Sequence, residues 1–578
     1  MEFIKGMDIS FLPEMLDRGA IFSDQYGNER NVFALLQENG VNSIRLRLWN
    51  EPENVPASKG YCNLEHTIKM AKKIKEYEMS FFLNFHYSDW WADPGKQEKP
   101  KAWKDLSFEE LIRAVYEYTK EVLMQLDAEN VFPDMVQIGN EIRSGMLFPD
   151  GEVPNYKELT QLINAGIQGV RDVAGSRHTK IVIHLDQGGR YFYLRDWFDQ
   201  VFSNGLMDFD IIGVSYYPFW HGTFGEFKET LVNLVDRYHK PIVIAETAHA
   251  WRLTENGFVG EKQEEIAGFR ATPEDQHKVI DLVMNITASL KEEMGIGIYY
   301  WEPVVVPLGD TGGWSSNMGV FSEEGKALPA LTCFQFERSN HHLKNIRNQV
   351  AKVYSPPKQI GVLGRGINLP SCVKVLYYDG SYKELPVMWE NYDYNLAGIN
   401  TISGSIPSTG DSISVEMELV RELKESHNFI PNGDFQEGLE GWNIKKEEGV
   451  RIEIHPEFLE PFPAPPIYYV YVESPMNFTL ELNKAINGLE PGIYCLSMEY
   501  RGTNTTGVDV ILFAQTKGNA RREEMIYPTD ENWITYTLSD IIVTDGEVIL
   551  GLNMKSPPIH GKIRKFTLTR QDNDAQEE

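Results

Sequence analysis

The chain has little positive charge for its length of 578 residues. Lysine and arginine number 55 against 84 aspartates and glutamates, so the net charge at pH 7 is −29. Binding to nucleic-acid phosphates needs a basic surface, and we therefore expect no nucleic-acid partner. The acidity is interpreted as a contribution to solubility.

Cysteines and long apolar runs are also scarce. The only cysteines are Cys62, Cys333, Cys372 and Cys495. Because they are widely spaced and form no CxxC pair or metal-type cluster, we expect separate thiols without a disulfide framework. No stretch reaches the ~18 consecutive apolar residues of a membrane helix, so we expect no membrane partner.

The amino terminus lacks the basic and then apolar layout of a secretory signal. Residues 1–6 instead lead directly into a predicted strand. The sequence as written therefore predicts a cytoplasmic protein, and an extracellular one if it is a trimmed mature form.

Apolar runs that resemble strands alternate with helical patterns over the first part of the chain. The predicted strands are Ile4–Ile9, Ser43–Trp49, Ser80–Phe85, Met135–Gly139, Lys180–Leu185, Ile211–Ser215, Pro241–Ala245 and Gly297–Trp301. Apolar residues three and four apart predict helices at Leu64–Tyr77, Phe108–Leu126, Tyr156–Val173, Tyr191–Phe202, Phe224–His239, Pro273–Met294 and Ala327–Phe336.

This alternation predicts a (β/α)8 barrel with enlarged loops. A doubly wound open sheet is the competing fold. It typically has a glycine-rich nucleotide-binding turn after an early strand, and the sequence has none.

The sequence pattern changes after residue 345, where short alternating strands and turn signals predict two β-rich domains. We expect the barrel at residues 1–345, a small β-sandwich at 346–425 and a second sandwich or jelly roll at 426–572. Residues 573–578 are polar and acidic and are expected to form a flexible tail.

Two of the predicted barrel strands end in a glutamate. Glu141 follows Met135–Gly139 and Asn140, and Glu246 follows Pro241–Ala245. In a parallel barrel the loops after the strands gather at one end, and strands four and seven face each other across it. Retaining glycosidases need two carboxyl groups ~5 Å apart, one as acid/base and one as nucleophile. A salt-bridged loop residue is the alternative for either glutamate alone.

The second and third predicted strands carry polar side chains toward the same end. Arg45 and Arg47 alternate with apolar residues and so point to one side of their strand. A buried arginine beside a nucleophilic carboxylate would keep it ionised, and a structural ion pair is the alternative. His86, with Asp89, Trp90 and Trp91 after it, has the composition of a sugar-binding loop, because indole faces stack on sugars and polar groups bind the hydroxyls. A packed or hydrogen-bonded histidine is the alternative for His86.

Several motifs together resemble glycoside hydrolase family 53, the endo-β-1,4-galactanases. They are Gly6–Ser10, Asn42–Arg47, His86 with Trp91–Pro94, Ile138–Arg143, His184–Asp186, Gly213–Phe219 and Tyr299–Pro303, in the family's order. The resemblance implies hydrolysis, with retention, of β-1,4-galactan, the side chain of pectin and of type I arabinogalactan.

By position in these motifs, Glu141 matches the acid/base and Glu246 the nucleophile. Residues that match the lining of the catalytic subsite are Asp8, Asn140, Tyr217 and Trp301. Bacterial members often hold calcium with clustered Asp, His and Asn after strand seven, but the loop Trp251–Thr272 does not contain that cluster. We therefore expect no metal and no cofactor.

The β-rich part carries weaker resemblances. Val373–Trp389 resembles bacterial immunoglobulin-like spacers, and Asn432–Phe435 with Gly441-Trp442 resembles the opening of jelly-roll carbohydrate-binding modules. The structural calcium of such modules is not expected here, because Lys562–Phe566 lacks the acidic pair. Candidates for stacking on sugar are Trp442, Tyr468, Tyr500 and Trp533, with a place in the core as the alternative for each.

The sequence thus predicts a monomeric endo-galactanase with a polysaccharide as its partner. A barrel glycosidase acting on glucan, mannan or xylan is the alternative within the same class. A sugar-binding protein on an inactive barrel is the alternative from another class. The presence of both glutamates argues against it.

Overall fold

The structure, a computed structural model, describes residues 2–255, 257–308, 317–356, 358–364, 369–420, 428–447, 449–457, 467–474, 477–502, 509–517, 521–526, 533–556 and 559–571. The chain forms two compact units. One contains Met1–Lys352 and Val375–Lys383, and the other contains Val353–Lys374 and Glu384–Glu578.

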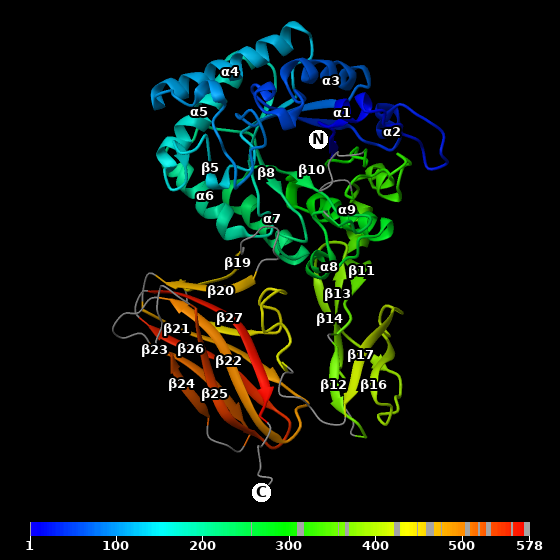
Figure 1. Cartoon of the computed structure of the whole chain (residues 1–578), viewed down its shortest axis with the longest axis vertical. Helices are drawn as coiled ribbons and strands as arrows, with labels where there is room; N and C mark the ends of the chain where they lie inside the picture. The colour runs from blue at the N-terminus through cyan, green and yellow to red at the C-terminus, as the bar shows by residue number, and fades with distance from the viewer. Residues whose placement is uncertain are drawn as a thin grey trace. The chain divides into compact units, whose positions relative to one another are not determined.

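A closed barrel of parallel strands surrounded by helices forms the first unit (Figure 1). Its strand order is β1-β10-β9-β8-β7-β4-β3-β2. These strands are β1 (Ile4–Asp8), β2 (Ser43–Leu48), β3 (Ser80–Phe85), β4 (Met135–Ile138), β7 (Lys180–Leu185), β8 (Ile211–Ser215), β9 (Ile242–Thr247) and β10 (Gly295–Trp301). They are apolar along most of their length because both faces are covered, one by the barrel interior and one by helices. The predicted barrel is confirmed.

Helices surround the barrel in sequence order with the strands. They are α1 (Leu12–Asp17), α2 (Val32–Glu38), α3 (Leu64–Glu76), α4 (Phe108–Ala128), α5 (Tyr156–Ala174), α6 (Tyr191–Ser203), α7 (Phe224–Tyr238), α8 (Glu261–Ala267), α9 (Pro273–Ala288) and α10 (Asn340–Asn345). The Ser107 hydroxyl and the Glu110 carboxylate form a reciprocal cap at the start of α4. Thr272 caps α9, whose first residue is Pro273.

The helix predictions differ from the structure in several places. The helices α1 and α2, between β1 and β2, were not predicted, and neither were the short helices α8 and α10. The helix predicted to reach Met294 ends at Ala288, because Leu290 has an extended backbone with φ −62° and ψ 142°. Glu292, further on, is left-handed with a φ of 53°. The helix predicted at Ala327–Phe336 is a 3₁₀ helix at Pro329–Gln335.

The barrel interior is apolar where the strands begin and polar where they end. At the end where the strands begin, a buried apolar cluster comprises Phe82, Met135, Val182, Ile211, Val243, Ile296 and Tyr299. It closes the amino-terminal end, so the buried polar side chains are concentrated toward the carboxyl ends of the strands.

Two sandwiches follow the barrel. The first has a sheet of β11 (Val350–Val353), β13 (Cys372–Tyr377) and β14 (Tyr382–Pro386), and one of β12 (Gln359–Val362), β17 (Ser412–Val420), β16 (Gly398–Ser405) and β15 (Met388–Trp389).

Two five-stranded antiparallel sheets form the second sandwich. One contains β18 (Asn443–Lys446), β21 (Phe478–Ile486), β26 (Val548–Ser556), β23 (Asp509–Thr516) and β24 (Arg522–Ile526). The other contains β19 (Arg451–Glu457), β20 (Ile467–Ser474), β27 (Ile559–Arg570), β22 (Gly492–Gly502) and β25 (Ile534–Val543). The prediction of a barrel followed by β-sandwich domains is confirmed.

All four cysteines are free thiols, as expected. In the part of the chain that the structure describes, the helices are too short or too polar to span a lipid bilayer.

Candidate active site

The chain turns sharply where β4 ends, and the turn presents Glu141 to the barrel mouth. Gly139 has a φ of 75°, and a Cβ atom there would lie 2.6 Å from Cγ2 of Ile142. Glu141 itself is left-handed, with φ 48° and ψ 50°. Such backbone is unfavourable for a residue with a side chain and is concentrated at functional sites.

Removal from water raises the pKa of Glu141 well above its usual range, and the negative charges of Glu246 and Asp186 raise it further. The Ser215 hydroxyl donates a hydrogen bond of 2.6 Å to Oε1 of Glu141 and opposes this rise. These surroundings therefore favour the protonated form of Glu141.

Glu246, at the end of β9, lies in a different environment. Its Oε1 accepts a hydrogen bond of 2.9 Å from Nη1 of Arg45, and its Oε2 accepts one of 3.2 Å from the Tyr217 hydroxyl. Burial raises the pKa of Glu246, but the Arg45 guanidinium and the Tyr217 hydroxyl counteract it. Among the described residues, no cation is hydrogen-bonded to Glu141 in this way.

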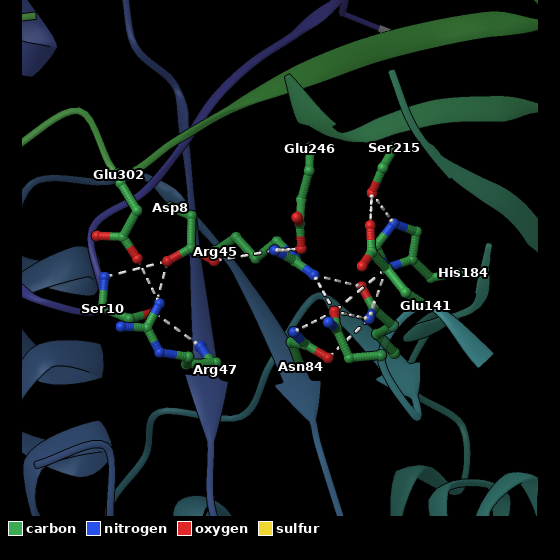
Figure 2. Close-up of polar contacts among 12 residues, drawn as sticks. Asp8, Ser10, Arg45, Arg47, Asn84, Glu141, His184, Ser215, Glu246 and Glu302 are labelled. Carbon is green, nitrogen blue, oxygen red and sulfur yellow. Dashed lines mark hydrogen bonds and ion pairs between the residues drawn. The ribbon is translucent and has the colours of Figure 1, made fainter. Parts of the chain in front are cut away.

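Arg45 is at the centre of the buried network (Figure 2). Besides Glu246, its Nη1 donates to Asp8 at 2.9 Å. Its Nη2 donates to Gln137 and to Asn140, each at 3.0 Å. Only 1% of this side chain is exposed. Arg45 thus organises the site from inside the barrel, and Asp8 is its second carboxylate partner.

The Asn140 side chain is fixed on both sides. Its Oδ1 accepts from Arg45, Asn84 and Gln137, and its Nδ2 donates to the Ala92 carbonyl at 2.8 Å. An amide nitrogen carries two hydrogens. The second hydrogen of Asn140 can therefore be offered to a sugar hydroxyl beside Glu141.

Arg47 lies between two aromatic rings. Its guanidinium is 4.2 Å from the ring centres of both Phe11 and Trp91, and it pairs with Glu302 at 2.6 Å. Burial raises the pKa of Glu302 to about 8, against the effect of Arg47. This arrangement fits a structural ion pair that holds Trp91 in place.

Four indole rings lie close to this pair. Trp91 is 6.2 Å from Trp301 and 5.4 Å from Trp49, and Trp90 is 4.5 Å from Trp49. Trp301 is also 6.4 Å from the ring of Tyr217, which bonds Glu246. Aromatic surface thus lies beside the two carboxylates, where a sugar ring can stack.

Two residues predicted to contact substrate, His86 and Asp89, are hydrogen-bonded to other groups of the protein instead. His86 Nδ1 accepts from the Ala92 amide at 3.0 Å, and burial, together with Arg47 and Arg45, lowers its pKa well below the usual value. Asp89 accepts bonds from the Glu51 amide, the Asn54 side chain and the Lys101 amide. Its carboxylate holds loops together, and this geometry favours a structural role over contact with sugar.

The sequence analysis gave no place in the site to three buried polar residues, Gln137, His184 and Ser215, although the last two lie in motifs of the family resemblance. They lie on β4, β7 and β8 and are fully buried. The available signal was a polar residue inside an otherwise apolar strand, because a buried polar side chain requires hydrogen-bond partners.

In the second sandwich, three of the four proposed stacking residues belong to the core. Trp442, Tyr468 and Tyr500 are 7%, 2% and 0% exposed and pack in one apolar cluster. Placing them on a binding face was therefore wrong. Trp533 lies at the surface, half-buried beneath the guanidinium of Arg564 at 3.9 Å.

The outer face of the sheet β19-β20-β27-β22-β25 carries other aromatic residues. Tyr469 and Tyr471 alternate with the buried residues of β20 and so point outward. The ring of Tyr469 is 5.8 Å from Trp533, and His455 is 5.6 Å from Tyr469 and 5.0 Å from Tyr471. We call Tyr469, Tyr471 and Trp533 the aromatic face.

Among the described residues, no group of three or more His, Cys, Asp or Glu side chains is arranged to hold a metal ion. The two candidate catalytic groups at the barrel mouth, Glu141 and Glu246, are carboxyl groups.

A parallel barrel with two carboxyl groups of different environment at the ends of its fourth and seventh strands defines a glycosidase of the barrel class. The model of Glycosyl hydrolase family 53 matches residues 4–334, more than half of the chain. The chain belongs to that family, as its motifs predicted. A second model, Bacterial Ig-like domain (group 4), matches residues 345–409.

Individual relatives align with the barrel. Over 352 residues the chain is 34% identical to the arabinogalactan endo-β-1,4-galactanase of Cellvibrio japonicus, covering 58% of this chain and 90% of that protein. It is 34% identical to arabinogalactan endo-β-1,4-galactanase A of Emericella nidulans, covering 55% and 87%. The solved family 53 catalytic domain of Ignisphaera aggregans is 38% identical, with a TM-score of 0.55 over 58% of this chain and 96% of that one.

Proposed function

We propose that this glycosidase is an endo-acting, retaining galactanase that cleaves β-1,4-galactosidic linkages of galactan and type I arabinogalactan. Support for the substrate comes from the relatives that are named arabinogalactan endo-β-1,4-galactanases. The observation that carries the mechanism is the difference between the two glutamates. Glu246 is paired with Arg45 at 2.9 Å, whereas Glu141 receives a hydrogen bond from the Ser215 hydroxyl.

In the first step, a carboxylate oxygen of Glu246 forms a bond to the anomeric carbon while the bond from that carbon to the glycosidic oxygen breaks. Glu141 gives its proton to the departing oxygen. Arg45 and Tyr217 orient the nucleophile and favour its ionised form.

In the second step, Glu141, now a carboxylate, takes a proton from water. The water oxygen attacks the anomeric carbon and the bond to Glu246 breaks. Two inversions give net retention, and both glutamates return to their starting states. Asn140 is placed to hold a sugar hydroxyl, and Trp91 and Trp301 provide surfaces for stacking.

The second sandwich, in this proposal, binds polysaccharide and performs no chemistry. Its support is the aromatic face, where Tyr469, Tyr471 and Trp533 offer ring surface beside polar and charged groups. Flat aromatic surface with neighbouring hydrogen-bond donors suits a chain of pyranose rings.

The adducts formed in the presence of azide test the roles of the two glutamates. Glu246→Ala should stop turnover, because no covalent intermediate can form. Azide should then enter from the vacated side and give an α-configured galactosyl azide. Glu141→Ala should keep activity on activated aryl galactosides but lose about 10²–10⁴-fold on galactan. With azide it should give the β-configured product.

The configuration of the azide products, read by NMR, decides the assignment. A β-adduct from Glu246→Ala would reverse the roles, and near-normal rates on galactan in both variants would remove the pair from catalysis. Product analysis of the unaltered enzyme on galactan, glucan, mannan and xylan tests the substrate. Preferential cleavage of another polymer would replace galactan as the substrate.

Binding to insoluble galactan tests the second sandwich. Tyr469→Ala, Tyr471→Ala and Trp533→Ala should each bind insoluble galactan more weakly and keep the rate on soluble galactan. A matched control is Met525→Ala on the other sheet, where Met525 is 37% exposed. If the three variants bind like the control, this sandwich has a structural role only.

A further inference from the structure

A continuous chain of hydrogen bonds joins Arg45 to Glu141 through three neutral side chains. Arg45 Nη2 donates to Oε1 of Gln137 at 3.0 Å, and Nε2 of Gln137 is 3.0 Å from Nδ1 of His184. Nε2 of His184 is 2.9 Å from the Ser215 hydroxyl, which donates to Oε1 of Glu141 at 2.6 Å. Figure 2 shows the end of this chain, from His184 through Ser215 to Glu141.

The guanidinium fixes the direction of the first two bonds. Arg45 can only donate, so the group of Gln137 that faces it must be the carbonyl oxygen. The amide nitrogen of Gln137 therefore lies 3.0 Å from Nδ1 of His184, and its two hydrogens are shared between that nitrogen, Oδ1 of Asn84 at 2.7 Å and the Gly139 carbonyl at 2.9 Å. Because an Nδ1–H group would face the amide hydrogens of Gln137, Nδ1 is the accepting nitrogen of the imidazole. A flipped amide would place N–H groups against the guanidinium and leave its donor without an acceptor.

The remaining two bonds follow from the first two. A neutral imidazole that accepts at Nδ1 carries its proton on Nε2, so His184 donates to the Ser215 oxygen. Burial and the charge of Arg45 lower the pKa of His184 well below its usual value, which keeps it neutral. The single hydrogen of Ser215 is then left for Oε1 of Glu141.

The opposite tautomer of His184 is disfavoured by its neighbours. It would donate from Nδ1 to Oδ1 of Asn140, which lies at 3.3 Å. That oxygen already accepts from Arg45, Asn84 and Gln137. The Gln137 amide would also face a second donor at 3.0 Å.

We propose that Ser215 is a positioning residue whose hydroxyl, oriented by His184 and Gln137, occupies Oε1 of Glu141 and leaves the catalytic proton on Oε2. This inference rests on the proposed acid/base role of Glu141. It makes Arg45 the common partner of both carboxylates, directly for Glu246 and through the hydrogen-bonded chain for Glu141. An acid with one defined proton position presents that proton to the glycosidic oxygen in every encounter.

The charged and titratable groups that act on Glu141 come from several elements. They are Glu246 at the end of β9, Asp186 after β7 with its partner Arg143, Asp93 in the loop after β3, and Tyr217 after β8. The three carboxylates disfavour a negative charge on Glu141. Ser215 is the hydrogen-bond donor that opposes them.

The pH dependence of kcat/KM on galactan tests the proposal. Ser215→Ala removes a donor to the ionised form, so the pKa of Glu141 should rise and the basic limb of the profile should move up by about one to two pH units. The acidic limb should stay in place, because it reports Glu246. Activity on galactan should fall while activated aryl galactosides are affected less.

Two variants serve as controls. Ser215→Thr keeps the hydroxyl and should keep the basic limb near that of the unaltered enzyme. Ser43→Ala removes another buried barrel hydroxyl, bonded to Tyr299 at 2.6 Å on the apolar side of the barrel, and should leave both limbs unchanged. A basic limb that stays in place in a folded Ser215→Ala enzyme, or that moves equally in Ser43→Ala, overturns the proposal.

A spectroscopic measurement separates this inference from the proposed function. The C=O stretch of protonated Glu141, assigned by its loss in Glu141→Gln, gives the pKa of this residue without catalysis. It should titrate at higher pH in Ser215→Ala. If Glu141→Gln retains the basic limb, the acid/base assignment fails. If the band titrates identically with and without the Ser215 hydroxyl, the role of Ser215 fails.

Discussion

Arg45 is bonded to the predicted nucleophile and to the asparagine beside the predicted acid, although it is 1% exposed. A guanidinium remains charged when buried, so its presence favours ionised carboxylates around it. Arg47, two residues further on the same face of β2, pairs instead with Glu302. The two arginines therefore allow the charge effect on Glu246 to be separated from general disruption of the site.

We expect Arg45→Met to shift the acidic limb of the kcat/KM profile to higher pH. The nucleophile acts as a carboxylate, so activity is lost as pH falls through its pKa. Removing a cation 2.9 Å away should raise that pKa by about one to three units. The profile is measured at a temperature at which the variant is folded. Arg47→Met is the control and should raise KM without moving the acidic limb, and an unmoved limb in Arg45→Met would contradict this assignment.

Single residues also mark where the sequence-based prediction of the sugar-binding face failed. Tyr468 was chosen and Tyr469 was not, although Tyr468 shares its side of β20 with Val470 and Val472. The alternation of β-branched residues identifies the inward side, and the outward tyrosines are those between them. The same reasoning places Tyr500 inward with Leu496 and Met498 on β22.

At the scale of elements, the turn after β4 depends on Gly139. Gly139→Ala should lower the free energy of unfolding by about 1–3 kcal/mol, because alanine is strained at a φ of 75°. The added methyl group also meets Ile142 at 2.6 Å, which should displace Glu141 and reduce activity. Thermal unfolding and the rate on soluble galactan measure the two effects.

Gly205, after α6, provides a matched control for this prediction. Its φ is 84°, close to the 75° of Gly139, and no atom of the described residues lies within 4 Å of an added Cβ. Gly205→Ala should therefore lose stability through backbone strain and retain its rate. Equal losses of rate in the two variants would show that strain in general, rather than the position of Glu141, explains the effect.

Elements were predicted well where burial is uniform and less well where local backbone decides. Barrel strands such as β3 and β7 match the predicted bounds because they are short apolar runs between turns. The short helices α1, α2, α8 and α10 were missed, and α9 ends before the extended residue Leu290, which helical periodicity does not reveal. In the site, the predicted glutamates, arginines and Asn140 lie together, but the links through Gln137, His184 and Ser215 follow only from the contacts between strands.

At the scale of the whole chain, residues Val375–Lys383 belong to the compact unit of the barrel. Asp379 pairs with Lys228 on α7 at 2.9 Å, and a Cβ at Gly380 would lie 2.8 Å from Ile286 on α9. The segment follows the predicted end of the barrel by thirty residues. The segment contacts α7 and α9 of the barrel, although the sequence pattern places it in the next domain, at residues 346–425.

A chain that ends after residue 352 should accordingly be less stable than one that ends after residue 420. We expect the barrel of the shorter chain to lose about 1–3 kcal/mol, through the unpaired Lys228 and the uncovered apolar surface at Ile286. Both chains should keep the rate on soluble galactan, since the segment contacts the helices α7 and α9 outside the barrel and the two glutamates lie at its mouth. Asp379→Asn in the longer chain isolates the ion pair. Equal melting temperatures for the two chains would contradict a stabilising role for the segment.

The burial of Glu141 also bears on how this protein can evolve. Its pKa is raised in the folded state, so as pH rises above the ordinary carboxyl value the unfolded chain ionises first and the folded state loses relative stability. Selection for heat resistance would therefore favour an uncharged residue at this position, while selection for turnover retains the acid. A lineage that adapts to high temperature must gain its stability elsewhere in the barrel, because replacing Glu141 by an uncharged residue would remove the catalytic acid.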